Sequence, residues 1–149
     1  MQNIKIEYKA KRSDNNEWVF GYYVVTPKNE HRIYLQPFPE ATSNTYFVVV
    51  PETVGQYICM KDSLGNKIYN GDVIEFDKGT IGTISWAEEK ISYCIIWKYR
   101  GRKIHKSLSW LKDRKIIIVI GNRYDNIIHT IDSNNIKSQQ SEIESWGGC

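Results

Sequence analysis

The residues best suited to a chemical role lie in one basic, aromatic-rich segment, residues 98–115. Eight Lys and Arg side chains stand there against one acid, Asp113, so the segment carries +7 while the whole chain carries only +3. Lysine and arginine neutralise phosphates and release counterions, and exposed aromatic rings stack on bases. The residues that we expect to contact nucleic acid are Lys98, Arg100, Arg102, Lys103, Lys106 and Trp110.

A hairpin is the element that must position these cations. Two strand-like runs, residues 91–99 and 102–108, flank Arg100-Gly101, which fits a two-residue hairpin loop. We expect the cations at positions 98, 100 and 102, with Lys106 beside them, to share one face of this hairpin. A second interpretation is that the cations only keep an edge strand from aggregating. In that case Trp97 and Trp110 belong to the core.

Catalytic and metal-binding patterns are weak. His31, His105 and His129 are far apart, and no two of them have a metal-ligand spacing. Cys94 lies in an apolar run and is more typical of an inert core residue than of a nucleophile. We therefore expect no catalytic residues, no metal, no cofactor and no enzymatic activity.

Composition predicts a mostly β fold. The chain has 21 Ile, 9 Val and 19 aromatic residues against 3 Ala and 4 Leu. Branched and aromatic side chains fit a pleated sheet, whereas Ala and Leu are the strong helix formers. Alternation and turn residues predict a meander of short antiparallel strands. The expected strands are residues 4–10, 17–25, 32–35, 46–50, 57–60, 73–76, 80–86, 91–99, 102–108 and 116–120.

Cysteine usage and hydropathy bear on location. Cys59, Cys94 and Cys149 are isolated and odd in number, which favours a reducing cytoplasm over a disulfide framework. No apolar run is long enough for a membrane helix, and residues 1–7 alternate instead of forming a signal peptide. We expect a cytoplasmic protein without a membrane partner.

Three collinear motifs carry a family resemblance. The first is Tyr8-Lys9-Ala10 followed by residues 18–21, Trp-Val-Phe-Gly; the second covers residues 50–74; the third is residues 119–126, Val-Ile-Gly-Asn-Arg-Tyr-Asp-Asn. Together they resemble the YopX family of small phage and prophage proteins. Independently of the family, Gly-Asp-Val at residues 71–73 and Gly-Thr-Ile at residues 79–81 are an arrangement common in small SH3-like barrels, so we expect an SH3-like element around residues 71–86. The resemblance implies a compact, barrel-like β domain. It implies no established activity, and no functional residue is carried over.

The signature residues themselves read as structural. We expect tight turns that need glycine or a capping aspartate at these positions. They are Gly55, Gly65, Gly71, Asp72 and Gly121.

The chain divides into a predicted domain, residues 1–131, and a polar segment, residues 132–149. The apolar residues Ile136, Ile143 and Trp146 fall at helical spacing, so a docked helix and a frayed tail are both open. The leading functional hypothesis is a non-catalytic phage or prophage accessory protein, in the bacterial host cell, that binds nucleic acid through the basic hairpin. The alternative is a homo-oligomeric interaction module that acts on a host protein.

Overall fold

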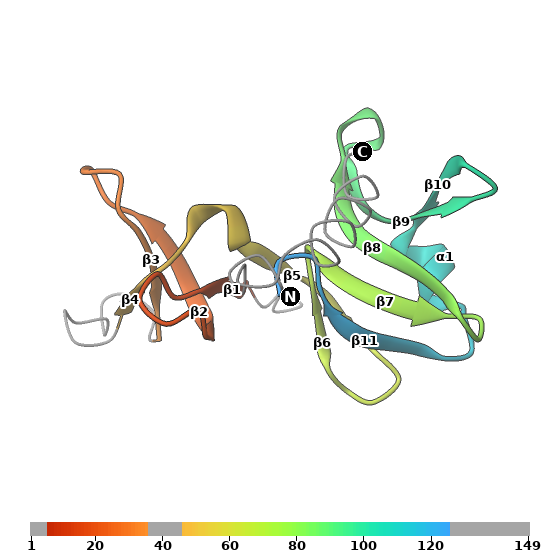
Figure 1. Ribbon diagram of the computed structural model, residues 1–149, viewed down its shortest axis with the longest axis horizontal. Coiled ribbons are helices and arrows are strands. Elements are labelled where there is room, and N and C mark those ends of the chain that lie inside the picture. The colour runs from red at the N-terminus through yellow and green to blue at the C-terminus, as the bar shows by residue number, and fades with distance from the viewer. Residues whose placement is uncertain (1–5, 36–45, 126–149) are drawn as a thin grey trace, which may run out of the picture. The chain divides into compact units, whose positions relative to one another are not determined.

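The computed structural model describes residues 6–35 and 46–125, which fall in two compact units, residues 1–59 and 60–149 (Figure 1). The fold is mostly β, as the composition predicts, with two antiparallel sheets and one short α-helix. The predicted division into residues 1–131 and 132–149 stays a prediction, and the expected C-terminal helix or tail lies outside the described residues.

The first unit is built on a meander of antiparallel strands. The longest strand, β2, pairs with β1 on one side and with β3 on the other. Its close approach to β3 requires Gly21, because a Cβ there would lie 2.1 Å from the carbonyl oxygen of Tyr34. The elements are β1 (Tyr8–Lys11), β2 (Trp18–Val25), β3 (His31–Tyr34), β4 (Tyr46–Val48), the 3-10 turn η1 (Pro51–Thr53) and the start of β5 (Gly55–Lys61).

A small core holds this unit together. Ala10, Ile33 and Val49 are buried on one face, and Tyr8 and Tyr23 pack against them. The sheet to which these strands belong has the order β4-β3-β2-β1-β5-β6, where β6 is Lys67–Tyr69.

The second unit contains a five-stranded sheet of order β10-β9-β8-β7-β11. Consecutive strands β7 to β10 form a meander, and β11 returns to pair with β7. The elements are β6 (Lys67–Tyr69), β7 (Asp72–Phe76), β8 (Thr80–Ala87), the 3-10 turn η2 (Glu88–Lys90), β9 (Ser92–Tyr99), β10 (Arg102–Ser107), α1 (Leu108–Lys112) and β11 (Ile117–Asn122).

Alternation explains the core of this sheet. Ile74, Phe76, Ile84 and Ile95 are nearly fully buried. Successive strand residues point to opposite faces, and the pairing of β7 with β8 and of β8 with β9 places these four side chains on the same face. Leu111 of α1 is also fully buried. Burial of each such aliphatic side chain stabilises the fold by roughly 1.5–3 kcal/mol.

The structure differs from the predicted elements in three places. The strand expected from residue 4 begins at Tyr8, β6 was not predicted, and neither was α1. The helix begins at Leu108 and is capped by Ser107, whose hydroxyl accepts a hydrogen bond from the backbone N–H of Trp110 (3.1 Å). The hairpin expected at residues 71–86 is present as β7 and β8, and its SH3-like character stays a prediction. Both sheets are open, so no closed barrel is found among residues 6–35 and 46–125.

Candidate functional site

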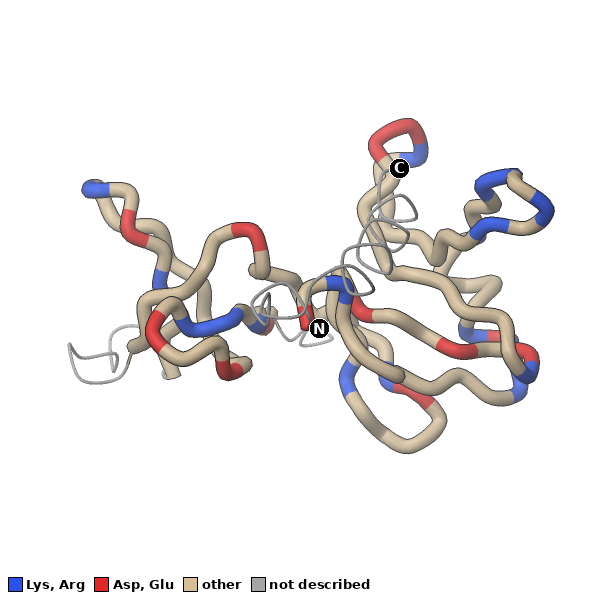
Figure 2. Tube along the Cα trace, in the orientation of Figure 1, with Lys and Arg blue, Asp and Glu red and all other residues tan. Residues whose placement is uncertain are grey.

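The basic hairpin has the expected turn. β9 and β10 are joined by Arg100-Gly101, and Tyr99 pairs with Arg102. Arg100 has φ +50° and Gly101 φ +77°, the left-handed conformation at both central positions that a type I′ hairpin turn requires. Figure 2 shows Lys and Arg residues gathered at the tip of this hairpin. The predicted two-residue loop is confirmed.

The cations of the hairpin lie on two faces. Residues opposite each other on paired strands share a face, and neighbours along a strand alternate. Lys98 is opposite Lys103, while Arg102 is opposite Tyr99 and shares its face with Lys106. The prediction that Lys98 and Arg102 lie on the same face is therefore wrong, because the turn places them one residue out of phase.

These hairpin cations are exposed and unneutralised. Lys98, Arg100, Arg102, Lys103 and Lys106 are all exposed. Within the described part of the chain none of the five has an ion pair with an acid. The ion pairs near them use other residues of the same unit, His105 with Glu89 (3.3 Å) and Arg114 with Asp77 (3.8 Å).

Trp110 is packed inside an aromatic cluster. Its ring stacks on Trp97 with centroids 5.5 Å apart and meets Phe76 edge-on at 5.6 Å. The guanidinium of Arg114 lies 4.3 Å from the Trp110 ring centre, and the Lys106 ammonium lies 5.7 Å away. Its ring surface is therefore largely used by neighbours. This packing favours a core role for Trp110 over the predicted stacking on a base.

A hollow lies beside the part of β9 that leads into the hairpin turn. Its volume is about 380 Å³. The β8–β9 ladder ends at Thr83 opposite Ile96, and the hollow occupies the fork beyond that pair. The residues that line it are Gly79, Thr80, Ile81, Trp97, Lys98 and Tyr99. Of these only Lys98 was predicted as a site residue, since the sequence gives no sign of where two strands diverge.

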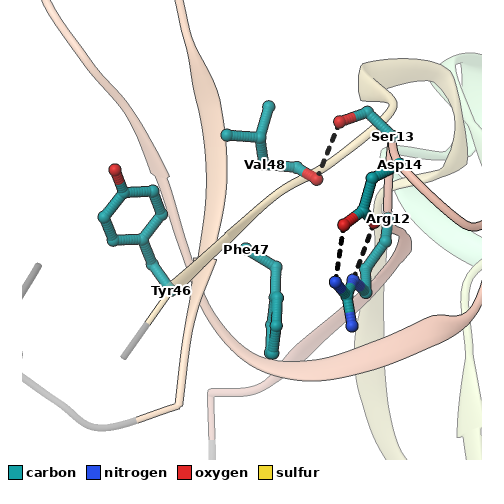
Figure 3. Close-up of a pocket in the computed structure, with 6 residues that line it drawn as sticks. All are labelled: Arg12, Ser13, Asp14, Tyr46, Phe47 and Val48. Atoms are coloured by element: carbon teal, nitrogen blue, oxygen red, sulfur yellow. Dashed lines mark hydrogen bonds and ion pairs between the residues drawn. The ribbon is translucent and has the colours of Figure 1, made fainter. Parts of the chain in front are cut away.

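A second hollow, of about 410 Å³, lies in the first unit beside β4 (Figure 3). It is lined by Tyr46, Phe47 and Val48 of β4 and by residues 12–14. The Arg12 guanidinium lies 4.2 Å from the centre of the Phe47 ring, a cation–π contact. This hollow was not predicted. The polar run Arg-Ser-Asp at residues 12–14 marks its position in the sequence, but it does not show that β4 lies beside it.

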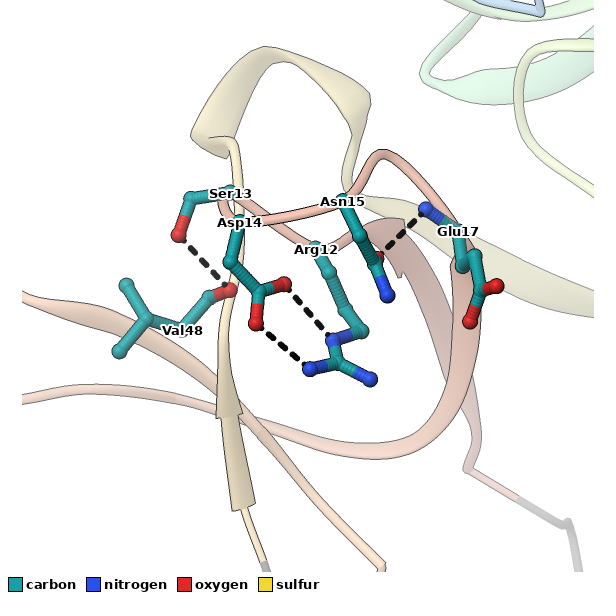
Figure 4. Close-up of polar contacts among 6 residues, drawn as sticks. All are labelled: Arg12, Ser13, Asp14, Asn15, Glu17 and Val48. Carbon is teal, nitrogen blue, oxygen red and sulfur yellow. Dashed lines mark hydrogen bonds and ion pairs between the residues drawn. The ribbon is translucent and has the colours of Figure 1, made fainter.

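The polar groups of that second hollow are satisfied by one another (Figure 4). Arg12 donates two hydrogen bonds to Asp14, of 2.9 Å and 2.6 Å, and the Ser13 hydroxyl donates to the carbonyl of Val48 (3.1 Å). The hydrogen bond from Arg12, followed by its charge, lowers the pKa of Asp14 despite partial desolvation. The same contact raises the pKa of Arg12. Arg12 therefore has a carboxylate partner at neutral pH.

The signature aspartate caps a buried turn. Asp72 is fully buried, and its carboxylate accepts hydrogen bonds from the backbone N–H of Tyr69 (2.8 Å) and from the side-chain amide of Asn122 (2.9 Å). Gly65 and Gly71 have φ of +86° and +94°, so they hold the left-handed conformation expected of turn glycines. Gly55 instead opens β5 opposite Lys9, and Gly121 lies in β11 at a register shift.

Asp62 is a second buried carboxylate, and it was not predicted. One oxygen accepts from the backbone N–H groups of Leu64 and Asn66, and the other from Val119 (3.0 Å) and the Asn66 side chain. Burial is the largest influence and raises the pKa of Asp62, but the hydrogen bonds outweigh it together and the pKa is lowered. Asp62 and Asp72 thus act as structural acceptors within the second unit.

Neither a metal centre nor a membrane helix is found in the part of the chain that the structure describes. Residues 6–35 and 46–125 contain no group of three or more His, Cys, Asp or Glu side chains arranged to hold a metal ion. No helix in these ranges is long and apolar enough to cross a membrane. Cys94 is fully buried opposite Ser107, and His105 is opposite Ile96.

Comparison with known proteins places the chain in a family. The family model described as YopX protein matches residues 7–127, and the chain belongs to the YopX family. No curated protein matches the chain. A similar solved structure is the crystal structure of protein EF1440 from Enterococcus faecalis, with 16% identity and a TM-score of 0.47 over 85% of this chain and 99% of that chain.

Proposed function

We propose that the protein is a non-catalytic accessory protein of a phage or prophage that binds nucleic acid through the hairpin of β9 and β10. The observation that carries this proposal is the set of five exposed cations without an acidic partner among the described residues, Lys98, Arg100, Arg102, Lys103 and Lys106. Unneutralised Lys and Arg attract phosphates, and the counterions that they displace favour binding. The bacterial cytoplasm is the proposed place of action.

Two features of the hairpin disfavour its own stability and support this role. Arg100 occupies a left-handed position where Asn, Asp or Gly is preferred. Lys98 and Lys103 stand directly opposite each other, an arrangement in which like charges repel. The turn fixes the left-handed conformation at this position, but a favoured residue would have met it without a positive charge, and unfavourable backbone conformations concentrate at functional sites. An anionic ligand would reduce the repulsion between Lys98 and Lys103, and it would also contact the positive charge of Arg100.

The test is fluorescence-anisotropy binding to short single- and double-stranded DNA and RNA at low and physiological salt. The triple variant Arg100→Glu, Arg102→Glu and Lys103→Glu is expected to lose salt-dependent binding. The matched control reverses three exposed lysines elsewhere, Lys28→Glu, Lys61→Glu and Lys90→Glu, which gives the same net charge. Equal losses in the two variants, or no binding by the wild-type chain at low salt, overturn the proposal.

A single substitution separates charge from stability. Arg100→Asn removes one cation and places a favoured residue at the left-handed position of the turn. We expect a thermal midpoint equal to or above that of the wild-type chain and a weaker affinity for nucleic acid. An Arg100→Asn chain that binds as tightly as the wild type removes Arg100 from the interface.

A second candidate is an interaction module that binds another copy of the chain or a host protein. Trp86 and Ile91, near the β8–β9 turn, favour this function because they are 43% and 79% exposed. β10 is also an edge strand, so its cations fit the role of keeping that edge soluble. Sedimentation of wild-type and Ile91→Ser chains tests it: a fall in oligomer size in the variant supports self-association, and an unchanged monomer opposes it.

A further inference from the structure

The fork between β8 and β9 has two strand edges that face a hollow. The ladder between these strands stops at Thr83 opposite Ile96, although β8 starts at Thr80 and β9 continues to Tyr99. On its other side each strand stays paired, β8 with β7 and β9 with β10. Backbone groups along a strand point alternately to its two sides. Within residues 80–82 and 97–99, alternate residues therefore direct their N–H and C=O groups toward the fork.

The structure keeps this fork open from both sides. The Trp97 ring packs against Phe76 and Trp110, with ring centroids 5.0 Å and 5.5 Å away. This packing fixes the path of β9 beyond the last pair of its ladder with β8. On the other side, the loop between β7 and β8 consists of three residues in the left-handed region, Asp77, Lys78 and Gly79. The hollow is thus bounded by structure that is fixed without a ligand.

The lining of the fork combines three kinds of contact. Tyr99 offers a flat aromatic ring, Trp97 lines the fork from within the aromatic cluster, and Thr80 and Ile81 complete this part of the lining. Tyr99 is 57% exposed, and the Arg100 guanidinium lies 5.3 Å from its ring centre. Lys98 supplies a positive charge. A ligand that fits has a flat ring, a polar edge and an attached anion.

We infer that the fork binds an unstacked nucleobase of single-stranded nucleic acid while the hairpin cations hold its phosphates. The volume of about 380 Å³ lies at the small end of ordinary ligand sites. In a duplex the edges of the bases are paired and their faces are stacked, so the fork selects single strands. This inference rests on the proposed nucleic-acid function, and it adds the part of the nucleotide that is recognised.

The experiment compares three probes on the full chain. They are a thymidine decamer, a decamer with the same sugar-phosphate backbone but without bases, and the thymidine decamer in a duplex. Stacking on an aromatic side chain is worth roughly 5- to 150-fold in affinity per base. The wild-type chain is therefore expected to prefer the thymidine decamer over the abasic one by at least about 5-fold. Tyr99→Ala should abolish that preference, and Tyr99→Phe should keep it.

Controls separate the failure of this inference from the failure of the proposed function. Tyr22→Ala, at a 38% exposed tyrosine of the first unit, should leave all three affinities unchanged. Equal, salt-dependent binding of the thymidine and abasic decamers overturns the base site and leaves the phosphate-binding hairpin standing. Absence of binding to every probe overturns both. A preference that survives Tyr99→Ala also overturns the assignment to the fork.

Discussion

Two regions of the molecule combine a cation with an aromatic ring, and they differ in whether the cation is neutralised. In the first unit the Arg12 guanidinium lies over Phe47 and holds Asp14 in a bidentate contact. In the second unit Arg100 lies over Tyr99 without an acid partner among the described residues. The difference teaches that a local carboxylate, and not the number of Lys and Arg residues, decides whether a basic surface is available for an anion.

The two hollows differ in the same way. Beside β4, the Ser13 hydroxyl is engaged by the Val48 carbonyl and Arg12 by Asp14. The β8–β9 fork is lined by Lys98, which has no ion pair with a described acid, and by strand residues that lie beyond the last pair of the β8–β9 ladder. A site whose polar groups are already paired must break those contacts to bind a ligand. Both hollows have similar volumes, so size alone does not distinguish them.

The largest expected effect comes from the most completely satisfied charge. A charged group whose hydrogen-bonding partners all lie within the fold is expected to act in stability and not in binding. Asp62 is such a group, because its carboxylate accepts four hydrogen bonds. Asp62→Asn replaces an acceptor with an amide donor that faces backbone N–H groups, which costs roughly 1–3 kcal/mol of unfolding free energy. Urea denaturation measures the loss, and nucleic-acid affinity below the unfolding transition should not change. A stable variant with altered affinity would contradict the comparison.

The pH dependence of this effect has a definite sign. The folded protein lowers the pKa of Asp62 below its ordinary value of 3.8, so the carboxylate stabilises the fold above that value. This stability is lost as the pH falls through the lowered pKa, because the unfolded chain, in which the carboxyl has its ordinary pKa, binds the proton more readily than the folded state. Denaturation between neutral pH and pH 3 should therefore show a smaller acid-induced loss for Asp62→Asn than for the wild type.

A smaller effect is expected when the hairpin is given the chemistry of the first unit. Lys98→Glu places a carboxylate directly opposite Lys103. The opposite-charge pair should stabilise the hairpin by a few tenths of a kcal/mol, roughly the range of cross-strand pairs. The slope of log affinity against log salt should fall by about 1–2, since two cations no longer meet phosphates. A salt slope equal to that of the wild type would show that these lysines face water only.

The smallest effect is the reciprocal change in the first unit. Asp14→Asn removes the partner of Arg12 without changing side-chain size. Exposed ion pairs contribute little to stability, so the thermal midpoint should stay within experimental error. Affinity for a short oligonucleotide at low salt should rise by a few-fold at most, because one freed guanidinium adds one phosphate contact. A large increase would mean that the first unit holds a masked anion site.

The sequence predicts those features that depend on neighbouring residues. The turn residues that precede them predict β2 and β8, and the Arg100-Gly101 pair predicts the hairpin turn. The helix α1 escapes prediction because five residues, capped by Ser107, give too short a pattern to stand out. The division of the cations between two faces was within reach, since a two-residue loop sets Lys98 opposite Lys103 by counting alone.

Features that depend on distant contacts were beyond sequence reasoning. The carboxylate of Asp62 binds a backbone group 57 residues away, and Asp72 meets Asn122 across 50 residues. No local pattern tells which distant strand will supply the donor. The fork is similar, because its shape depends on Trp97 meeting Phe76 and Trp110. Charge was therefore readable from the sequence, while the hollow beside it was not.

The hydrogen bond from Val119 to Asp62 also affects the order in which the chain can fold during its synthesis. β7 and Asp62 both find their partners in β11, the last strand of the described chain. While the ribosome makes the intervening residues, the outer edge of β7 waits without β11. Pairings of such high contact order form late and leave nascent strands open to association. A ribosome that stalls before residue 117 therefore carries a second unit that cannot close, however complete the first has become.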